Sequence, residues 1–335
     1  MMWVKKSGKL VMDRSQPESA AAGNRTGMSA LHAQRRRFLA ALGGAVATCA
    51  CPGFALGQGA APINRRVPVS GEILPAIGVG SWITFNVGAA AEARAPLVPV
   101  LQTFFDRGGA MIDSSPMYGT SEAVIGFLLS RTSNRSRLFS ATKIWTFGKA
   151  ASVRQMQTSL ELWGIPRFDL VQIHNMLHWE THVETLKELK AAGKVRYIGI
   201  TSSNGRGHEE MERALRRERF DFVQFTYNFA DRSVENRLLP LAVERGLAVI
   251  INRPFDGGDL FSVVKQKSLP PWAREFDCTN WAQFFLKFVI SHPAVTCAIP
   301  ATSQTGHMVE NMGALYGRLP DANTRERMIQ FMAMH

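Results

Sequence analysis

Four polar side chains of complementary chemistry follow apolar stretches between residues 113 and 174. They are Asp113 and Tyr118 within residues 111–119, Lys143 at the end of LFSATK, and His174 at the end of DLVQIH. A free phenol is a weak proton donor near neutral pH because its pKa is about 10. A neighbouring ammonium favours the phenolate and lowers that pKa. The set therefore predicts a general acid, Tyr118, tuned by Lys143 with Asp113 as the charge partner of the amine.

The role expected of His174 follows from that of Tyr118. An imidazole beside the phenol can hydrogen-bond a carbonyl oxygen while a hydride reaches the carbonyl carbon. This chemistry needs no metal ion. A lone Asp, Lys or His at a strand end is more often a turn, solvated or structural residue, but four in order favour a functional site. An isomerase or lyase would need a metal or a paired acid and base, and neither pattern is present.

Such residues meet only if consecutive strands end at one rim. Short apolar stretches are predicted as strands at residues 76–81, 110–113, 138–142, 169–173, 195–200, 222–225, 247–251 and 295–299. Segments of helical period lie at 91–107, 121–129, 153–162, 183–192, 209–217, 235–245, 280–290 and 305–315, with one more from 323 to the end. This alternation predicts an α/β protein, a single-domain (β/α)8 TIM barrel over residues 62–335, with its site at the carboxyl ends of the strands.

Two features are expected at the start of this domain. Residues 66–69 and 73–74 flank a polar turn and predict a β-hairpin that precedes the barrel. The first strand, AIGVGS, carries Gly78 and Gly80. No third glycine follows at the offset of a dinucleotide-binding loop, so these glycines are expected to allow tight packing inside the barrel.

Composition and charge restrict the class of protein. The 335 residues are 46% hydrophobic and 20% charged, which is typical of a globular chain. The formal net charge is +12, and residues 1–61 hold eight basic residues against two acidic ones. The remainder has no basic run with interleaved aromatics, so no nucleic-acid partner is expected.

Residues 1–61 have the pattern of an export signal and a disordered leader. Arg35, Arg36 and Arg37 precede Phe38-Leu39 and an apolar run of small residues. RRRFL is similar to the core of a twin-arginine signal, which predicts the twin-arginine export machinery as a partner and a periplasmic location. An ordinary secretory signal or a basic helix start are the alternatives, and an unused signal would leave the protein in the cytoplasm. The apolar run is too short and too rich in Gly and Ala for a stable membrane anchor.

The four cysteines divide between the two parts. Cys49 and Cys51 lie in the leader, and Cys278 and Cys297 lie in the barrel segment. Whether the latter two pair is left open, because pairing requires that they meet in space.

From about residue 66 to residue 316 the chain resembles the aldo-keto reductases. The matching stretches are AIGVG, residues 113–119 with their SPMYG ending, ATKIW, VQIHN, GIT at 199–201 and the late IPA and EN pairs. The resemblance implies a catalytic tetrad of Asp113, Tyr118, Lys143 and His174. It also implies that an aldehyde or ketone, a small-molecule carbonyl substrate, is reduced to an alcohol with NADP(H) or NAD(H). The cofactor would lie extended across the barrel mouth without a Rossmann fold.

The resemblance also implies contacts to that cofactor. Thr201 and Ser202 match a pair that holds the nicotinamide carboxamide, and Gln224 matches a residue that contacts the same amide. The aromatic that stacks on the ring falls at Asn252 or Arg253, with Phe255 nearby as a substitute. The further contacts implied are Arg253, Thr302, Glu310 and Asn311. The two basic residues expected at a 2′-phosphate are replaced by Ala301 and His307.

A second function remains open at this point. A nucleotide-binding barrel can serve as a redox sensor or accessory subunit without efficient turnover. The changed residues at the stacking and phosphate positions favour that alternative, whereas the complete tetrad favours an enzyme.

Overall fold

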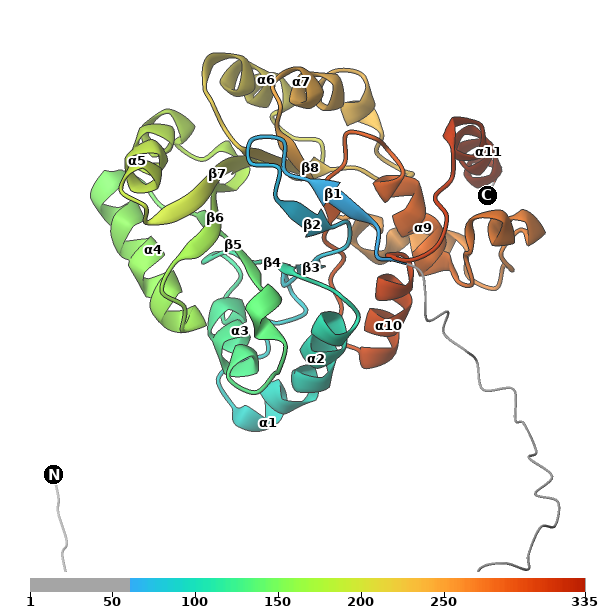
Figure 1. Cartoon of the computed structure of the whole chain (residues 1–335), viewed down its shortest axis with the longest axis horizontal. Coiled ribbons are helices and arrows are strands. Elements are labelled where there is room, and N and C mark those ends of the chain that lie inside the picture. Colours follow the sequence, from blue (N-terminus) through green and yellow to red (C-terminus); the bar gives the residue numbers. More distant parts are fainter. Residues whose placement is uncertain (1–60, 335) are drawn as a thin grey trace, which may run out of the picture. The chain divides into compact units, whose positions relative to one another are not determined.

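The computed structural model describes residues 61–334, in which a ring of parallel strands is surrounded by helices (Figure 1). The predicted export signal, with Cys49 and Cys51, lies outside the described residues. The strands of the ring are β3 Val79–Gly80, β4 Met111–Asp113, β5 Phe139–Ile144, β6 Phe168–Ile173, β7 Val195–Thr201, β8 Phe222–Thr226, β9 Ala248–Asn252 and β10 Cys297–Ala298. They pair in sequence order, each parallel to the next.

The last strand meets the first, which makes the sheet a barrel. Parallel bridges join Ile77 to Ala298 and Gly80 to Ala301. A Cβ added at Gly80 would lie 2.9 Å from the carbonyl oxygen of Ile299, so the close approach of these two strands requires glycine. The predicted (β/α)8 fold and the packing role of this glycine are confirmed.

Helices connect the strands and cover the outside of the barrel. They are α1 Ala91–Arg94, α2 Val98–Asp106, α3 Ser121–Leu129, α4 Lys149–Trp163, α5 Trp179–Ala191, α6 His208–Arg217, α7 Leu238–Glu244, α8 Asp259–Val263, α9 Trp281–Ile290, α10 Thr305–Gly313 and α11 Ala322–Ala333. The helix expected over 91–107 is interrupted by a 3₁₀ turn at Ala95–Leu97, where Pro96 is incompatible with a continuous helix. Among the described residues no helix has the length and apolar character to cross a membrane.

The predicted hairpin is present with shifted ends. β1 Asn64–Arg66 pairs antiparallel with β2 Ile73–Pro75, and the hairpin lies across one end of the barrel (Figure 1). Val67 and Leu74 pack into the barrel interior. Glu72 of its turn accepts hydrogen bonds from Arg196 and Tyr197 of β7. The hairpin therefore closes the end of the barrel where the strands begin, which leaves the other end for the site.

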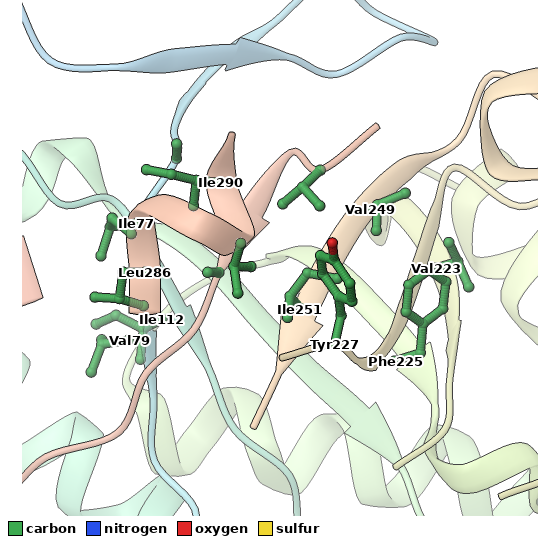
Figure 2. Packing of buried hydrophobic residues seen from close by; sticks show 14 of the residues in the cluster. Ile77, Val79, Ile112, Val223, Phe225, Tyr227, Val249, Ile251, Leu286 and Ile290 are labelled. Carbon is green, nitrogen blue, oxygen red and sulfur yellow. The ribbon is translucent and has the colours of Figure 1, made fainter. Parts of the chain in front are cut away.

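Alternation along each strand decides which side chains enter the barrel. In β8, Phe222 packs into the interior cluster, whereas Val223 and Phe225 pack between the strands and the helices (Figure 2). The same period places Met111 inside and Ile112 outside in β4. Because the period is two, the polar residue that follows each inward apolar residue by two positions also points inward.

Candidate active site

The predicted tetrad comes together at the carboxyl ends of β4, β5 and β6. Asp113 ends β4, Lys143 is the penultimate residue of β5, and His174 follows β6 directly. Tyr118 lies in the turn between β4 and α3. Asp113, Tyr118 and His174 line a cavity of about 350 Å³, and Lys143 is buried beside them. The predicted convergence of strand ends therefore exists in this fold.

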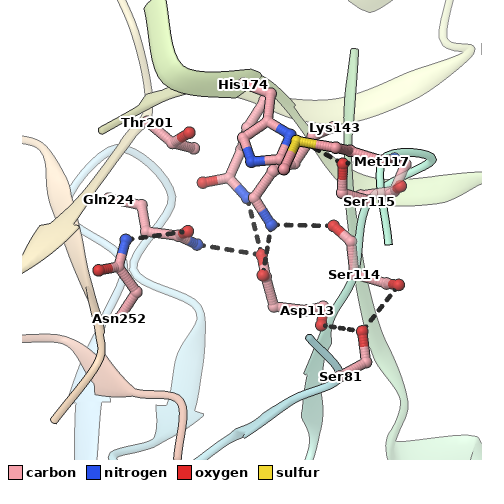
Figure 3. A network of polar contacts seen from close by, with 12 residues as sticks. Ser81, Asp113, Ser114, Ser115, Met117, Lys143, His174, Thr201, Gln224 and Asn252 are labelled. Carbon is pink, nitrogen blue, oxygen red and sulfur yellow. Dashed lines mark hydrogen bonds and ion pairs between the residues drawn. The ribbon is translucent and has the colours of Figure 1, made fainter. Parts of the chain in front are cut away.

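The ion pair between Asp113 and Lys143 is buried and fully hydrogen-bonded (Figure 3). Lys143 Nζ donates to Asp113 Oδ2 and, at 2.9 Å, to the carbonyl oxygen of Ser114. Asp113 Oδ1 accepts from the side-chain amides of Gln172 and Gln224, each at 3.0 Å. Burial opposes the charged amine, but the Asp113 carboxylate outweighs it and the pKa of Lys143 is raised. The lysine is therefore a fixed ammonium.

Gln172 is a functional neighbour that sequence reasoning missed. It lies two residues before His174 in β6, so both side chains point into the barrel. The signal that identifies it is a polar residue at an inward position of the strand, two residues after the inward apolar Leu170. Its contact with Asp113 helps to fix the carboxylate against Lys143.

Tyr118 lies beside both the ammonium and the imidazole. Lys143 Nζ is 5.2 Å from the centroid of the phenol ring. The rings of Tyr118 and His174 pack edge to face, with their centroids 5.5 Å apart. Burial raises the pKa of Tyr118, and Lys143 lowers it by less. The expectation that the ammonium would bring this pKa below its ordinary value is therefore wrong in its net direction. The phenol stays protonated at neutral pH, as a proton donor must.

His174 is held as a neutral ring. The residue is 4% exposed, and its Nδ1 lies 2.8 Å from Ser115 Oγ. The ring centroids of His174 and Trp145 are 5.2 Å apart. Burial, followed by the charge of Lys143, lowers the pKa of His174 to about 2. A neutral imidazole can hydrogen-bond a carbonyl oxygen without competing with Tyr118 for the role of acid.

Of the predicted cofactor contacts, Thr201, Gln224 and Arg253 line the cavity and Ser202 does not. The Ser202 hydroxyl donates to the carbonyl oxygen of Arg206 and so stabilises the loop between β7 and α6. The Gln224 amide nitrogen is bonded to Asp113. Arg253 has a buried Nε with no hydrogen-bond partner among residues 61–334.

The three residues predicted at the far end of the cofactor lie outside the cavity lining. The Thr302 hydroxyl accepts a hydrogen bond from the backbone N–H of Gln304 at 3.1 Å, just before α10. Glu310 and Asn311 lie on α10, with Asn311 buried. The cavity therefore brings together the tetrad and the residues predicted near the nicotinamide, but not these three.

At the position expected for a stacking aromatic, Asn252 has a different role. Its side chain donates to the carbonyl oxygen of Ser202 at 2.8 Å and accepts from the Thr226 hydroxyl at 2.7 Å, which joins the ends of β7, β8 and β9. An aromatic nevertheless lines the cavity nearby. Phe255 lines the cavity, and its ring centroid lies 4.9 Å from that of Phe261.

The rest of the cavity wall combines positive charge with apolar surface. Arg206, which sequence reasoning missed, lines it together with Arg253. A Cβ at Gly258 would meet no atom within 4 Å, which leaves room for a ligand against the backbone. Trp82, Ile83 and Met117 are exposed apolar side chains in the lining. The two guanidinium groups fit the phosphates of a nucleotide, and the apolar side chains fit an uncharged organic molecule.

The Asp113–Lys143 pair predicts non-additive effects on stability. Lys143→Met leaves a buried carboxylate without its cation and should lower the free energy of unfolding by about 3–5 kcal/mol. The double variant Asp113→Asn with Lys143→Met removes both charges, and Asn keeps an oxygen for Gln172 and Gln224. It should cost less than Lys143→Met alone, as measured by urea unfolding. Additive losses would contradict the buried pair.

Comparison with known proteins gives a consistent result. The model of the Aldo/keto reductase family matches residues 76–326. The chain is similar to the methylglyoxal reductase YeaE of Escherichia coli (strain K12), with 27% identity over 271 residues that cover 77% of this chain and 92% of that protein. It is also similar to the NADH-specific methylglyoxal reductase of Escherichia coli (strain K12), with 27% identity over 236 residues, 60% of this chain and 70% of that one.

A solved structure agrees with these relatives. An aldo-keto reductase from Klebsiella pneumoniae in complex with NADPH is 27% identical, with a TM-score of 0.68, and the match covers 81% of this chain and 95% of that one. The family match spans most of the sequence and includes the whole tetrad. The chain therefore belongs to the aldo/keto reductase family.

Proposed function

We propose that the protein is a nicotinamide-dependent oxidoreductase that reduces a small aldehyde or ketone to an alcohol. The observation that carries the proposal is the position of Tyr118 at the cavity, with Lys143 Nζ 5.2 Å from the centroid of its ring and the ring of His174 at its edge. A carbonyl oxygen bound between Tyr118 and His174 would receive its proton from the phenol. Lys143 would then stabilise the phenolate that remains.

The nicotinamide cofactor is NADP(H) or NAD(H), and when bound it supplies the hydride. The similar proteins include a complex with NADPH and an NADH-specific enzyme. Arg253 has an unpaired Nε beside the cavity, and Arg206 adds a second positive charge there. We assign these two residues to the phosphates of the cofactor. Thr201 and Gln224 line the cavity where the carboxamide would bind, and Ser202, Thr302, Glu310 and Asn311 remain predicted contacts.

The tetrad separates this function from a sensor or accessory subunit. A binding module needs no buried ammonium beside a phenol, and maintaining an ion pair in a barrel interior has a desolvation cost. The relatives that match this chain are named as reductases. The missing stacking aromatic, which favoured a sensor, is offset by Phe255 in the cavity lining.

Export is a separate proposal that rests on the sequence of residues 1–61. The arrangement RRRFL followed by small apolar residues supports the twin-arginine route to the periplasm. That route carries folded proteins, which suits a barrel that binds a nucleotide before export.

The export proposal predicts a dependence on the arginine pair. Arg35→Lys with Arg36→Lys keeps the charge but should abolish periplasmic accumulation of a reporter that folds before export and is fused after residue 61. Lys5→Ala with Lys6→Ala, upstream of the signal, is the control and should leave export intact. Unchanged export of the arginine variant would contradict the twin-arginine assignment.

The assignment of Tyr118 predicts a loss of catalysis without a loss of binding. Tyr118→Phe should lower kcat for carbonyl reduction by about 10²- to 10⁴-fold, the usual contribution of a general acid. Quenching of nicotinamide fluorescence should give an unchanged Kd for the nucleotide. Tyr316→Phe is a matched control, because that hydroxyl bonds the carbonyl oxygen of Arg107 outside the cavity. Wild-type turnover by Tyr118→Phe would refute the mechanism.

The lowered pKa of His174 predicts the shape of the pH profile. Since this pKa is about 2, the ring stays neutral as the pH falls through the range of about 5–8 where a histidine ordinarily titrates. The profile of kcat/KM for reduction should therefore show no acidic limb from an imidazole. His174→Gln should be slower with a profile of the same shape. An acidic limb that disappears in His174→Gln would contradict this assignment.

A further inference from the structure

Ser115, in the turn after β4, contacts the ring of His174 and has no role in the function proposed above. Its side chain is 1% exposed, and its Oγ lies 2.8 Å from Nδ1 of His174 (Figure 3). The same oxygen accepts the backbone N–H of Met117 at 3.2 Å. Among residues 61–334 these are the two hydrogen bonds of that hydroxyl. Ser115 therefore lies between a fixed backbone donor and one nitrogen of a catalytic ring.

The positions of the protons follow from these two contacts. If Nδ1 carried the ring proton, Ser115 Oγ would accept from both N–H groups and its own hydroxyl proton would have no acceptor. If Nε2 carries the ring proton, Ser115 donates to Nδ1 and accepts from Met117, and every group is paired. A buried donor without a partner carries a desolvation penalty, so the second arrangement is favoured.

The second arrangement also suits the cavity. His174 lines it, and Nε2 has no hydrogen-bond partner in the described part of the chain. The ring is held between the indole of Trp145 and the phenol of Tyr118, so it has a defined orientation. With the proton on Nε2 the ring offers a donor to a carbonyl oxygen. With the proton on Nδ1 it would offer a lone pair and repel that oxygen.

We propose that Ser115 fixes His174 in the tautomer whose Nε2–H faces the cavity, and so acts as a positioning residue for the carbonyl oxygen. The kinetic part of this inference rests on the proposed reductase function. The tautomer itself does not, because it follows from contacts within the chain.

The test measures the tautomer and the kinetics on the same variants. In wild-type protein labelled with ¹⁵N-histidine, two-bond ¹H–¹⁵N correlation spectra should place the His174 proton on Nε2, with His174→Gln used for assignment. Ser115→Ala should produce a population with the proton on Nδ1. It should also lower kcat/KM for the carbonyl about ten-fold, the size expected for the loss of one hydrogen bond in the site, with the nucleotide Kd unchanged. Ser115→Thr keeps the hydroxyl and should restore both readouts.

The control is another buried serine–histidine pair. Ser152 Oγ lies 3.1 Å from Nδ1 of His182, and neither residue lines the cavity. Ser152→Ala removes a comparable hydrogen bond and should leave kcat/KM and the His174 signals unchanged. This separates a specific effect at His174 from a general effect of losing a buried hydroxyl.

Three outcomes would overturn the inference. They are a wild-type proton on Nδ1 of His174, an unchanged tautomer in Ser115→Ala, and a shifted tautomer with an unchanged kcat/KM. If the wild-type protein reduced no carbonyl with either nucleotide, the proposed function would fail. The spectra would still decide whether Ser115 sets the tautomer.

Discussion

The buried ion pair between Asp113 and Lys143 is the interaction on which the site depends. Neither charge is solvated, so each relies on the other and on the amides of Gln172 and Gln224 for its stability. The geometry that satisfies this pair also places the ammonium beside the ring of Tyr118. The Asp113–Lys143 pair therefore both stabilises two buried charges and places the ammonium beside the phenol.

The barrel makes this contact possible. Parallel strands all end at one rim, and their alternation directs Asp113, Lys143 and Gln172 inward from three neighbouring strands. The hairpin closes the opposite end with Val67 and Leu74. Polar residues at the strand ends consequently face a cavity on one side and a packed apolar interior on the other.

Most of the fold was predictable from the sequence because the period of the apolar residues changes between strands and helices. Ile112 and Val223 pack outward where the alternation predicts, and the tetrad lies at the strand ends as expected. Pro96 explains why the helix expected over residues 91–107 is interrupted at Ala95–Leu97. What the sequence did not reveal depends on distances between strands. The contact of Ser115 with His174, 59 residues further along the chain, and the net effect of burial on Tyr118 both arise from tertiary contacts, which local patterns do not encode.

The Lys143 ammonium, paired with Asp113, favours ionisation of the Tyr118 phenol, although burial keeps the phenol protonated at neutral pH. The pKa of Tyr118 can be measured directly from ultraviolet absorbance as a function of pH. The absorbance of the matching Tyr118→Phe protein is subtracted, so that only the signal of Tyr118 remains. We expect the pKa of Tyr118 to lie above the ordinary tyrosine value of about 10, and to rise further when Lys143→Met and Asp113→Asn are combined. A phenol that ionises at neutral pH, or a titration unchanged by the loss of the ion pair, would contradict this expectation.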